Sequence, residues 1–117
     1  MISKAGQSRD EALYDEARSL ADQGDFGRAE ILAGLLLESA PDDIEGLLLM
    51  GLISRAQGKP ESAAEFYRKV LYLEPTHRDA LMHYSLFLEQ KGDENKAAAL
   101  RKRLVRLDMQ RKDSHGG

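Results

Sequence analysis

Apolar residues recur along the chain at the spacing of a helix face, without the alternation that a half-buried strand would show. Leu13, Ala17 and Leu20, for example, fall at positions i, i+4 and i+7, which places them on one side of a helix. The pattern predicts an all-α fold of six helices. Their expected ranges are 10–23, 26–39, 43–57, 60–73, 77–91 and 94–110.

The chain also repeats itself at one fixed step. This repeat period is the distance from Gly24 to Gly58, and again from Gly58 to Gly92. The other positions that keep the step are Leu13, Leu47 and Leu81, Ala29, Ala63 and Ala97, and Pro41 with Pro75. Four registers with one period indicate an internal repeat in which each unit holds two helices.

The repeated glycines and prolines stand where helices are expected to end. Each glycine follows the first helix of a pair and tolerates the left-handed conformation that a helix end needs. Pro41 and Pro75 follow the second helix, which a proline cannot continue. Asp42 and Thr76 come next and are the expected caps of the following helices.

The middle unit carries a large residue, two glycines, an alanine, an aromatic residue and a proline at set offsets. These residues are Leu47, Gly51, Gly58, Ala63, Tyr67 and Pro75. The arrangement resembles the tetratricopeptide repeat, a helix–turn–helix unit. The first unit departs from this pattern at Ala17 and Ala33, and the third at Ser85 and Arg101, as the end units of an array do.

The resemblance implies three tandem units at residues 10–43, 44–77 and 78–109, whose six antiparallel helices stack as a short right-handed solenoid with a concave groove. Residues 1–9 are then expected to form a flexible lead, and residues 110–117 a disordered tail. In such a stack the first helix of each pair lines the groove, which is the expected site of a protein or peptide ligand. The expected groove residues are Tyr14, Arg18, Glu45, Leu48, Leu52, Arg55, Asp79, Met82, Leu86 and Glu89.

The helix expected around residues 44–53 is apolar on nearly all sides, more than a short stack can bury. Leu48 and Leu52, with Met82 and Leu86, are therefore predicted to form an open apolar strip that binds an amphipathic helix or an extended apolar segment. The alternative is that these leucines belong to the core.

Composition narrows the function classes. The 117 residues suit one domain, the absence of cysteine excludes disulfides and thiolate sites, and no apolar stretch reaches the length that spans a bilayer. With no export signal in the sequence, we expect a cytoplasmic protein without membrane insertion. The net charge of −3 argues against general nucleic-acid binding, which depends on neutralising phosphates.

The charge is unevenly distributed, at −7 for residues 1–50 and +4 for residues 51–117. The basic end is interpreted as a solvated helix face, with an acidic partner as the alternative. Ala97, Leu100, Leu104 and Val105 need cover that no later helix supplies. Either basic side chains lie over them with their aliphatic stems, or another copy or domain does. We therefore expect at most weak self-association through this uncapped helix.

Residues for catalysis or for metal and cofactor binding are not apparent in this chain. His77 and His83 are six residues apart and fall on different faces of a helix. The glycines are isolated and form no phosphate loop. Adjacent carboxylates, such as Asp42 with Asp43, stand where helices begin and are explained by capping. We therefore expect no enzyme activity, metal site or cofactor in this chain.

Four further stretches of the sequence are more specific than the general repeat pattern. They are residues 66–77, 80–84, 87–93 and 99–107. Together they resemble the repeat region that follows the catalytic domain in chemotaxis-type receptor methyltransferases, the CheR family. The resemblance implies a parent enzyme that uses S-adenosylmethionine to methylate receptor glutamates, with this chain as its C-terminal module. That module would dock a receptor, a signalling partner or its own catalytic domain. The alternative is a free-standing bacterial adaptor, or a secretion or pilus assembly chaperone that holds an apolar peptide.

Overall fold

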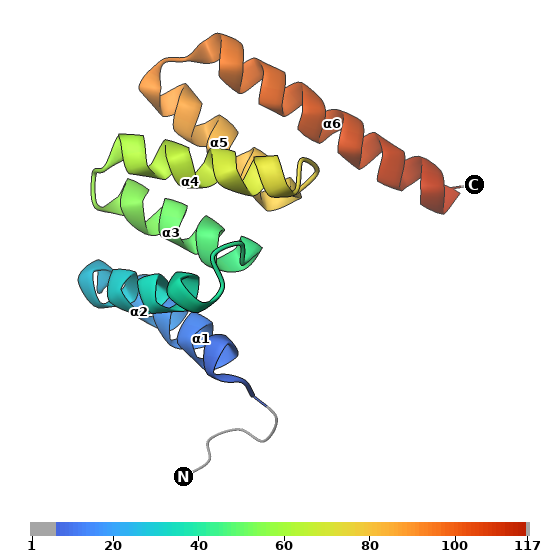
Figure 1. Cartoon of the computed structure of the whole chain (residues 1–117). Helices are drawn as coiled ribbons and strands as arrows, with labels where there is room; N and C mark the ends of the chain where they lie inside the picture. Colours follow the sequence, from blue (N-terminus) through green and yellow to red (C-terminus); the bar gives the residue numbers. More distant parts are fainter. Residues whose placement is uncertain (1–6, 117) are drawn as a thin grey trace. The chain divides into compact units, whose positions relative to one another are not determined.

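The computed structural model describes residues 7–116, with side chains through Lys112, and within this range every regular element is a helix. All six predicted helices are present (Figure 1). They are α1 (Arg9–Asp22), α2 (Phe26–Ser39), α3 (Ile44–Ala56), α4 (Pro60–Leu73), α5 (Arg78–Lys91) and α6 (Glu94–Gly116). The predicted all-α class is confirmed.

The repeated glycines end the first helix of each pair as predicted. Gly24, Gly58 and Gly92 have φ values of 83°, 74° and 88°. A side chain would be strained in this left-handed conformation, whereas glycine adopts it freely. The repeat period therefore records a backbone requirement at these three positions.

The predicted caps of α3 and α5 are wrong by one residue. The N-caps are Asp43 and His77, and the Nδ1 atom of His77 accepts a hydrogen bond of 3.1 Å from the Ala80 N–H. The cause is a turn after each second helix, in which the N–H groups of Asp43 and His77 donate to carbonyls three residues earlier. Asp42 and Thr76 follow the prolines inside these turns and so precede the caps.

The two predicted flanks, residues 1–9 and 110–117, are described by the structure only in part. Residues 1–6 of the predicted lead lie outside the described residues. Ser8 caps α1 in a capping box with Glu11, so that the helix begins at Arg9. At the other end, α6 continues through Gly116 where the sequence analysis predicts a disordered tail. Met109 stands where a third repeat proline would end the helix, and no glycine or proline interrupts residues 94–115.

The chain divides into two compact units, one ending at Phe66 and the other beginning at Tyr67, inside α4. In the first unit α1 packs against α2, and α2 against α3. Small and branched apolar side chains form its core. They are Ala17, Leu20, Ala29, Ala33, Leu49 and Ile53.

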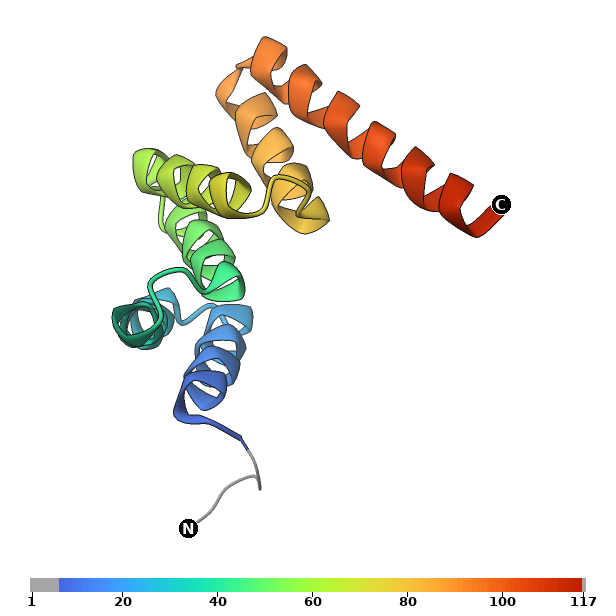
Figure 2. The same ribbon diagram turned by 45° about the vertical axis from the view of Figure 1, so that its right-hand side comes forward.

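Aromatic rings form the core of the second unit. The Tyr67 ring lies 5.6 Å from Tyr84 and 5.7 Å from Phe87, measured between ring centroids. Next to them α5 packs against α6, where Ala97 and Leu100 are buried. The views agree that α6 is the long helix of this pair (Figure 2). Of the described helices, none combines the length and apolarity needed to cross a bilayer.

Candidate protein-binding surfaces

In the first unit, the structure brings three of the predicted groove residues together. The side chain of Tyr14 on α1 packs against the alanine-rich core. Burial raises the pKa of the Tyr14 phenol, and the nearby Glu45 carboxylate of α3 raises it further. Arg18, one turn along α1, hydrogen-bonds the phenol and has the opposite effect on its pKa. The cluster thus combines a phenol hydroxyl with the exposed side chains of Arg18 and Glu45.

The burial of Leu48 contradicts its predicted place on an open apolar strip. This leucine is only 5% exposed, between the equally buried Leu47 and Leu49. The alternative that the sequence left open, a core leucine, applies at this position, because α3 is surrounded on most sides. Leu52 and Arg55 are half-buried.

In the second unit, the predicted groove residues all lie on α5. Leu86 is exposed, with 42% of its surface accessible, and Asp79 is exposed as well. Met82 is half-buried, and its carbonyl accepts a hydrogen bond from the buried Ser85 hydroxyl. This helix therefore presents a small apolar surface with an acid near its beginning.

Glu89 has a partner that sequence reasoning missed. Its carboxylate pairs with Arg101 of α6, which also lies 3.5 Å from Glu94. Arg101 occupies the position that is aromatic in the middle unit, where Tyr67 is fully buried. At this repeat position an ion pair of Arg101 thus replaces the ring packing of the middle repeat. Glu89 is paired within its own hairpin, α5–α6.

The ten predicted groove residues are divided between the units, with six in the first and four in the second. Within each unit the structure brings neighbouring members together. A continuous groove through all three hairpins stays a prediction of the sequence.

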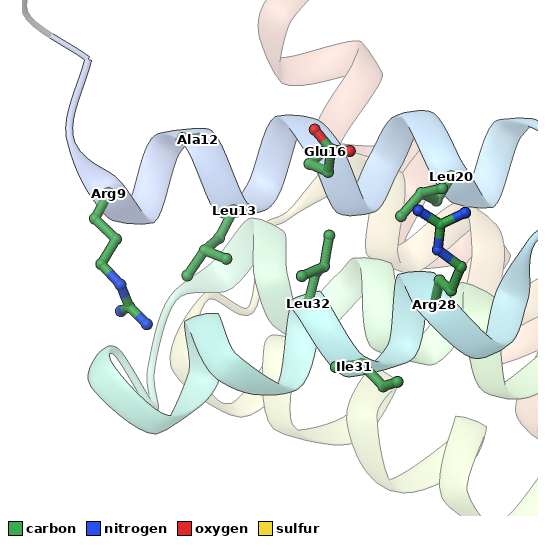
Figure 3. A pocket seen from close by; sticks show the side chains of 8 residues that line it. All are labelled: Arg9, Ala12, Leu13, Glu16, Leu20, Arg28, Ile31 and Leu32. Carbon is green, nitrogen blue, oxygen red and sulfur yellow. The ribbon is translucent and has the colours of Figure 1, made fainter. Parts of the chain in front are cut away.

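A pocket that the sequence analysis did not predict lies between α1 and α2 (Figure 3). Its volume is about 550 Å³, and it is lined by Arg9, Ala12, Leu13, Glu16, Leu20, Arg28, Ile31 and Leu32. Figure 3 shows Arg9 and Arg28 at its two ends, with leucines from both helices between them. Ile31 beside it is 64% exposed.

A second unpredicted feature joins the start of α5 to the C-terminal half of α6. Arg78 at the start of α5 grips Asp108 of α6 with two hydrogen bonds, of 2.9 and 3.1 Å. Hydrogen bonding to this guanidinium lowers the pKa of the Asp108 carboxyl, and the same bond raises the pKa of Arg78. Arg103 nearby donates to the Pro75 carbonyl at 2.7 Å. Polar contacts therefore join these parts of the hairpin.

The described residues contain no group of three or more histidine, cysteine or carboxylate side chains that could hold a metal ion. His77 acts as a helix cap, and His83 on α5 is half-buried.

Comparison with known families matches the tetratricopeptide repeat twice, over residues 14–78 and 48–112. The chain belongs to the tetratricopeptide repeat family. The two overlapping matches are offset by one repeat period, and they include the outer units that depart from the pattern.

Curated proteins and solved structures similar to this tetratricopeptide repeat chain include the following. "Probable biofilm formation methyltransferase WspC" of Pseudomonas aeruginosa is 36% identical over 93 residues, which are 80% of this chain and 22% of the relative. The chain spans about a fifth of the length of such curated relatives. Two solved structures share its fold at 20% identity. A MamA RS-1 double mutant has a TM-score of 0.85 and covers 91% of this chain and 60% of its own, and the Yersinia enterocolitica secretion chaperone SycD, in complex with a peptide of the translocator YopD, has 0.79 and covers 90% and 80%.

Proposed function

We propose that this tetratricopeptide repeat chain is the protein-interaction module of a chemotaxis-type receptor methyltransferase. The identity to WspC carries the proposal, because it extends over 80% of the chain at 36%. General features of the repeat, such as the glycines that end its helices, cannot by themselves account for identity at that level. The methyl transfer itself, from S-adenosylmethionine to receptor glutamates, would belong to residues of the parent enzyme outside this module. Such an enzyme would work in the cytoplasm, where the methylated helices of its receptors lie.

The module would bind an amphipathic helix or an extended apolar segment. Leu86 and Met82 supply apolar surface on α5, and Asp79 lies near them on the same helix. On α1, in the first unit, Tyr14 and Arg18 supply a hydroxyl and a cation to a contact of their own. Apolar contacts would give such a complex most of its affinity, and the charged side chains would set the orientation of the ligand.

A binding experiment tests this proposal with three purified ligands. They are the cytoplasmic helical fragment of the receptor, the catalytic domain of the methyltransferase, and the methyltransferase's signalling partner, each titrated with the chain by fluorescence anisotropy. We expect saturable binding to at least one of them. Leu86→Glu should weaken it by about tenfold or more, since a carboxylate would have to be buried against an apolar ligand.

Tyr72→Glu is the matched control, because Tyr72 is 84% exposed on α4 and lies outside the predicted groove. Circular dichroism checks that both variants fold. If none of the three ligands binds, or if both substitutions weaken binding equally, the proposal is wrong.

A second candidate function is a free-standing adaptor or secretion chaperone. The observation that favours it is the shared fold with SycD, a chaperone solved with a translocator peptide. The reading frame upstream of this chain separates the two candidates. An in-frame methyltransferase domain supports the first, whereas an isolated gene with saturable binding of an apolar translocator peptide supports the second.

A further inference from the structure

We propose that the pocket between α1 and α2 receives α6 of a second copy of this chain, so that copies associate head to tail. This goes beyond the proposed function and stands independently of it. The starting point is a contact inside the first unit. A Cβ atom placed on Gly46 of α3 would lie 2.9 Å from Cδ2 of Leu36 and 3.2 Å from Cδ2 of Leu37. These two leucines of α2 are therefore the side chains that cover the start of α3.

The equivalent positions can be compared one repeat period earlier in the chain. Ala12 and Leu13 of α1 stand one repeat period before Gly46 and Leu47. Gly46 is buried and Leu47 is 2% exposed, whereas Ala12 is exposed and Leu13 is only half-buried. Both line the pocket. Within the described residues, α1 therefore has no counterpart of the cover that α2 gives to α3.

In the third repeat, at residues 78–109, the equivalent positions are buried as well. Ala80 and Leu81 stand one repeat period after Gly46 and Leu47, and they are again almost inaccessible. An alanine is thus accommodated where α3 has its glycine, and the alanine of α1 is no obstacle to a covering helix.

The register also identifies a helix suited to give that cover. Leu104 and Val105 of α6 stand two repeat periods after Leu36 and Leu37. Val105 is 57% exposed and Met109, one turn further, is 60% exposed. They occupy the side of α6 on which a fourth hairpin would pack. Because α6 lacks the repeat proline, it offers an unbroken helix there.

The two surfaces are both partly apolar, and the helices α1 and α6 that carry them have opposite net charges. Exposed apolar residues such as Ile31 and Val105 would leave water together. α1 has five acids against two bases, a formal charge of −3, and α6 has seven bases against three acids, +4. The charged residues that line the pocket itself are Arg9, Arg28 and Glu16, so the opposite net charges of the two helices act at longer range, by speeding the encounter. Two different surfaces meet, so the contact is heterologous and can add further copies in a row.

Sedimentation velocity tests the proposal over a concentration series of the chain from about 1 µM to about 1 mM, a range that covers weak association. We expect the mean mass to rise with concentration, past the dimer at the upper end. Raising the salt should weaken the association, because the charges on α1 and α6 are exposed and screened. A chain that stays monomeric throughout overturns the proposal and leaves the pocket to a partner of another sequence.

Two variants identify the surfaces. Val105→Lys removes the inserting face, and Ile31→Lys the receiving face. Each alone should weaken association by about tenfold or more. Mixed together, the two variants should form a dimer and nothing larger, because each keeps one intact face of opposite kind. Met109→Lys provides a second variant of the inserting face, and circular dichroism confirms that all of them fold.

Tyr72→Lys is the control, since it adds the same charge at an exposed apolar position outside both surfaces. It should associate like the unchanged chain. If the mixture of Val105→Lys and Ile31→Lys stays monomeric, or if Tyr72→Lys weakens association as much as either of them, the head-to-tail contact is excluded.

Discussion

The two units of the chain fill equivalent positions with very different side chains. Ala33 in α2 and Tyr67 in α4 stand one repeat period apart and are both completely buried. Around Ala33 the core consists of alanines, leucines and an isoleucine, while around Tyr67 two further aromatic rings complete the packing. One repeat position thus accepts a methyl group or a phenol ring.

The difference shows that the repeat fixes the direction of a side chain more strictly than its volume. Alanines at Ala17, Ala29 and Ala33 allow α1 and α2 to approach closely. In the second unit, tilted and edge-on rings occupy the volume that such alanines would leave empty. Each unit should then be sensitive to the opposite change in size.

Tyr67→Ala should give the largest loss of stability. Removing a completely buried ring leaves a cavity beside Tyr84 and Phe87, and the free energy of unfolding should fall by about 3–5 kcal/mol. Tyr67→Phe is the control, because it keeps the ring and should cost only about 1 kcal/mol. Urea denaturation measures both. Equal losses for the two variants would show that the hydroxyl, and not ring packing, stabilises this unit.

Ala33→Leu tests the opposite change in the first unit. The added atoms have no space between tightly packed helices, so the free energy of unfolding should fall by about 1–3 kcal/mol. Ala99→Leu makes the same substitution at an exposed position of α6 and should change stability little. If Ala33→Leu melts like the unchanged chain, the close approach of α1 and α2 is not set by their alanines.

The sequence predicts the helices and their ends well because those features depend on local geometry. The left-handed conformation at Gly24, Gly58 and Gly92 requires no knowledge of distant residues. The N-caps are less predictable, because their position depends on the length of the turns that contain Pro41 and Pro75.

Burial and binding surfaces could be predicted only in part, because they depend on what packs against each helix. An apolar helix gives no sign of which leucine remains accessible, so the sequence predicts Leu48 on the open strip although it is buried. The α1–α2 pocket went unpredicted because Leu13 has the same residue type as the buried Leu47 and Leu81. The difference lies in what packs against each leucine, which its residue type does not record.

Both units contain a glycine that ends a helix at positive φ. Alanine at this position should lower the free energy of unfolding equally in both. Gly24→Ala and Gly92→Ala should each lower the free energy of unfolding by about 1–2 kcal/mol, because a Cβ atom is strained at positive φ. Gly34→Ala, inside α2 with open space around its Cα, should raise it by up to about 1 kcal/mol. Thermal melts compare the three. A gain at Gly92 would contradict the left-handed helix end.

The smallest expected effect concerns a polar contact that joins the start of the first helix of a hairpin to its second helix. In the first unit the Ser39 hydroxyl donates to Asp10 at 2.7 Å, and in the second Arg78 pairs with Asp108. Arg78 lowers the pKa of Asp108 below its ordinary value of 3.8, so the pair contributes stability above that value. The contribution is lost as the pH falls through the lowered pKa.

Asp108→Asn should therefore melt slightly below the unchanged chain at neutral pH and together with it in strong acid. Added salt should shrink the difference, because both groups are exposed to water. Arg78→Gln in the Asp108→Asn background should have no further effect if the two side chains act only on each other. A difference in melting temperature that persists in strong acid would show that the asparagine disturbs the helix itself. Stability of this part of the second unit would then come from the packing of α5 on α6.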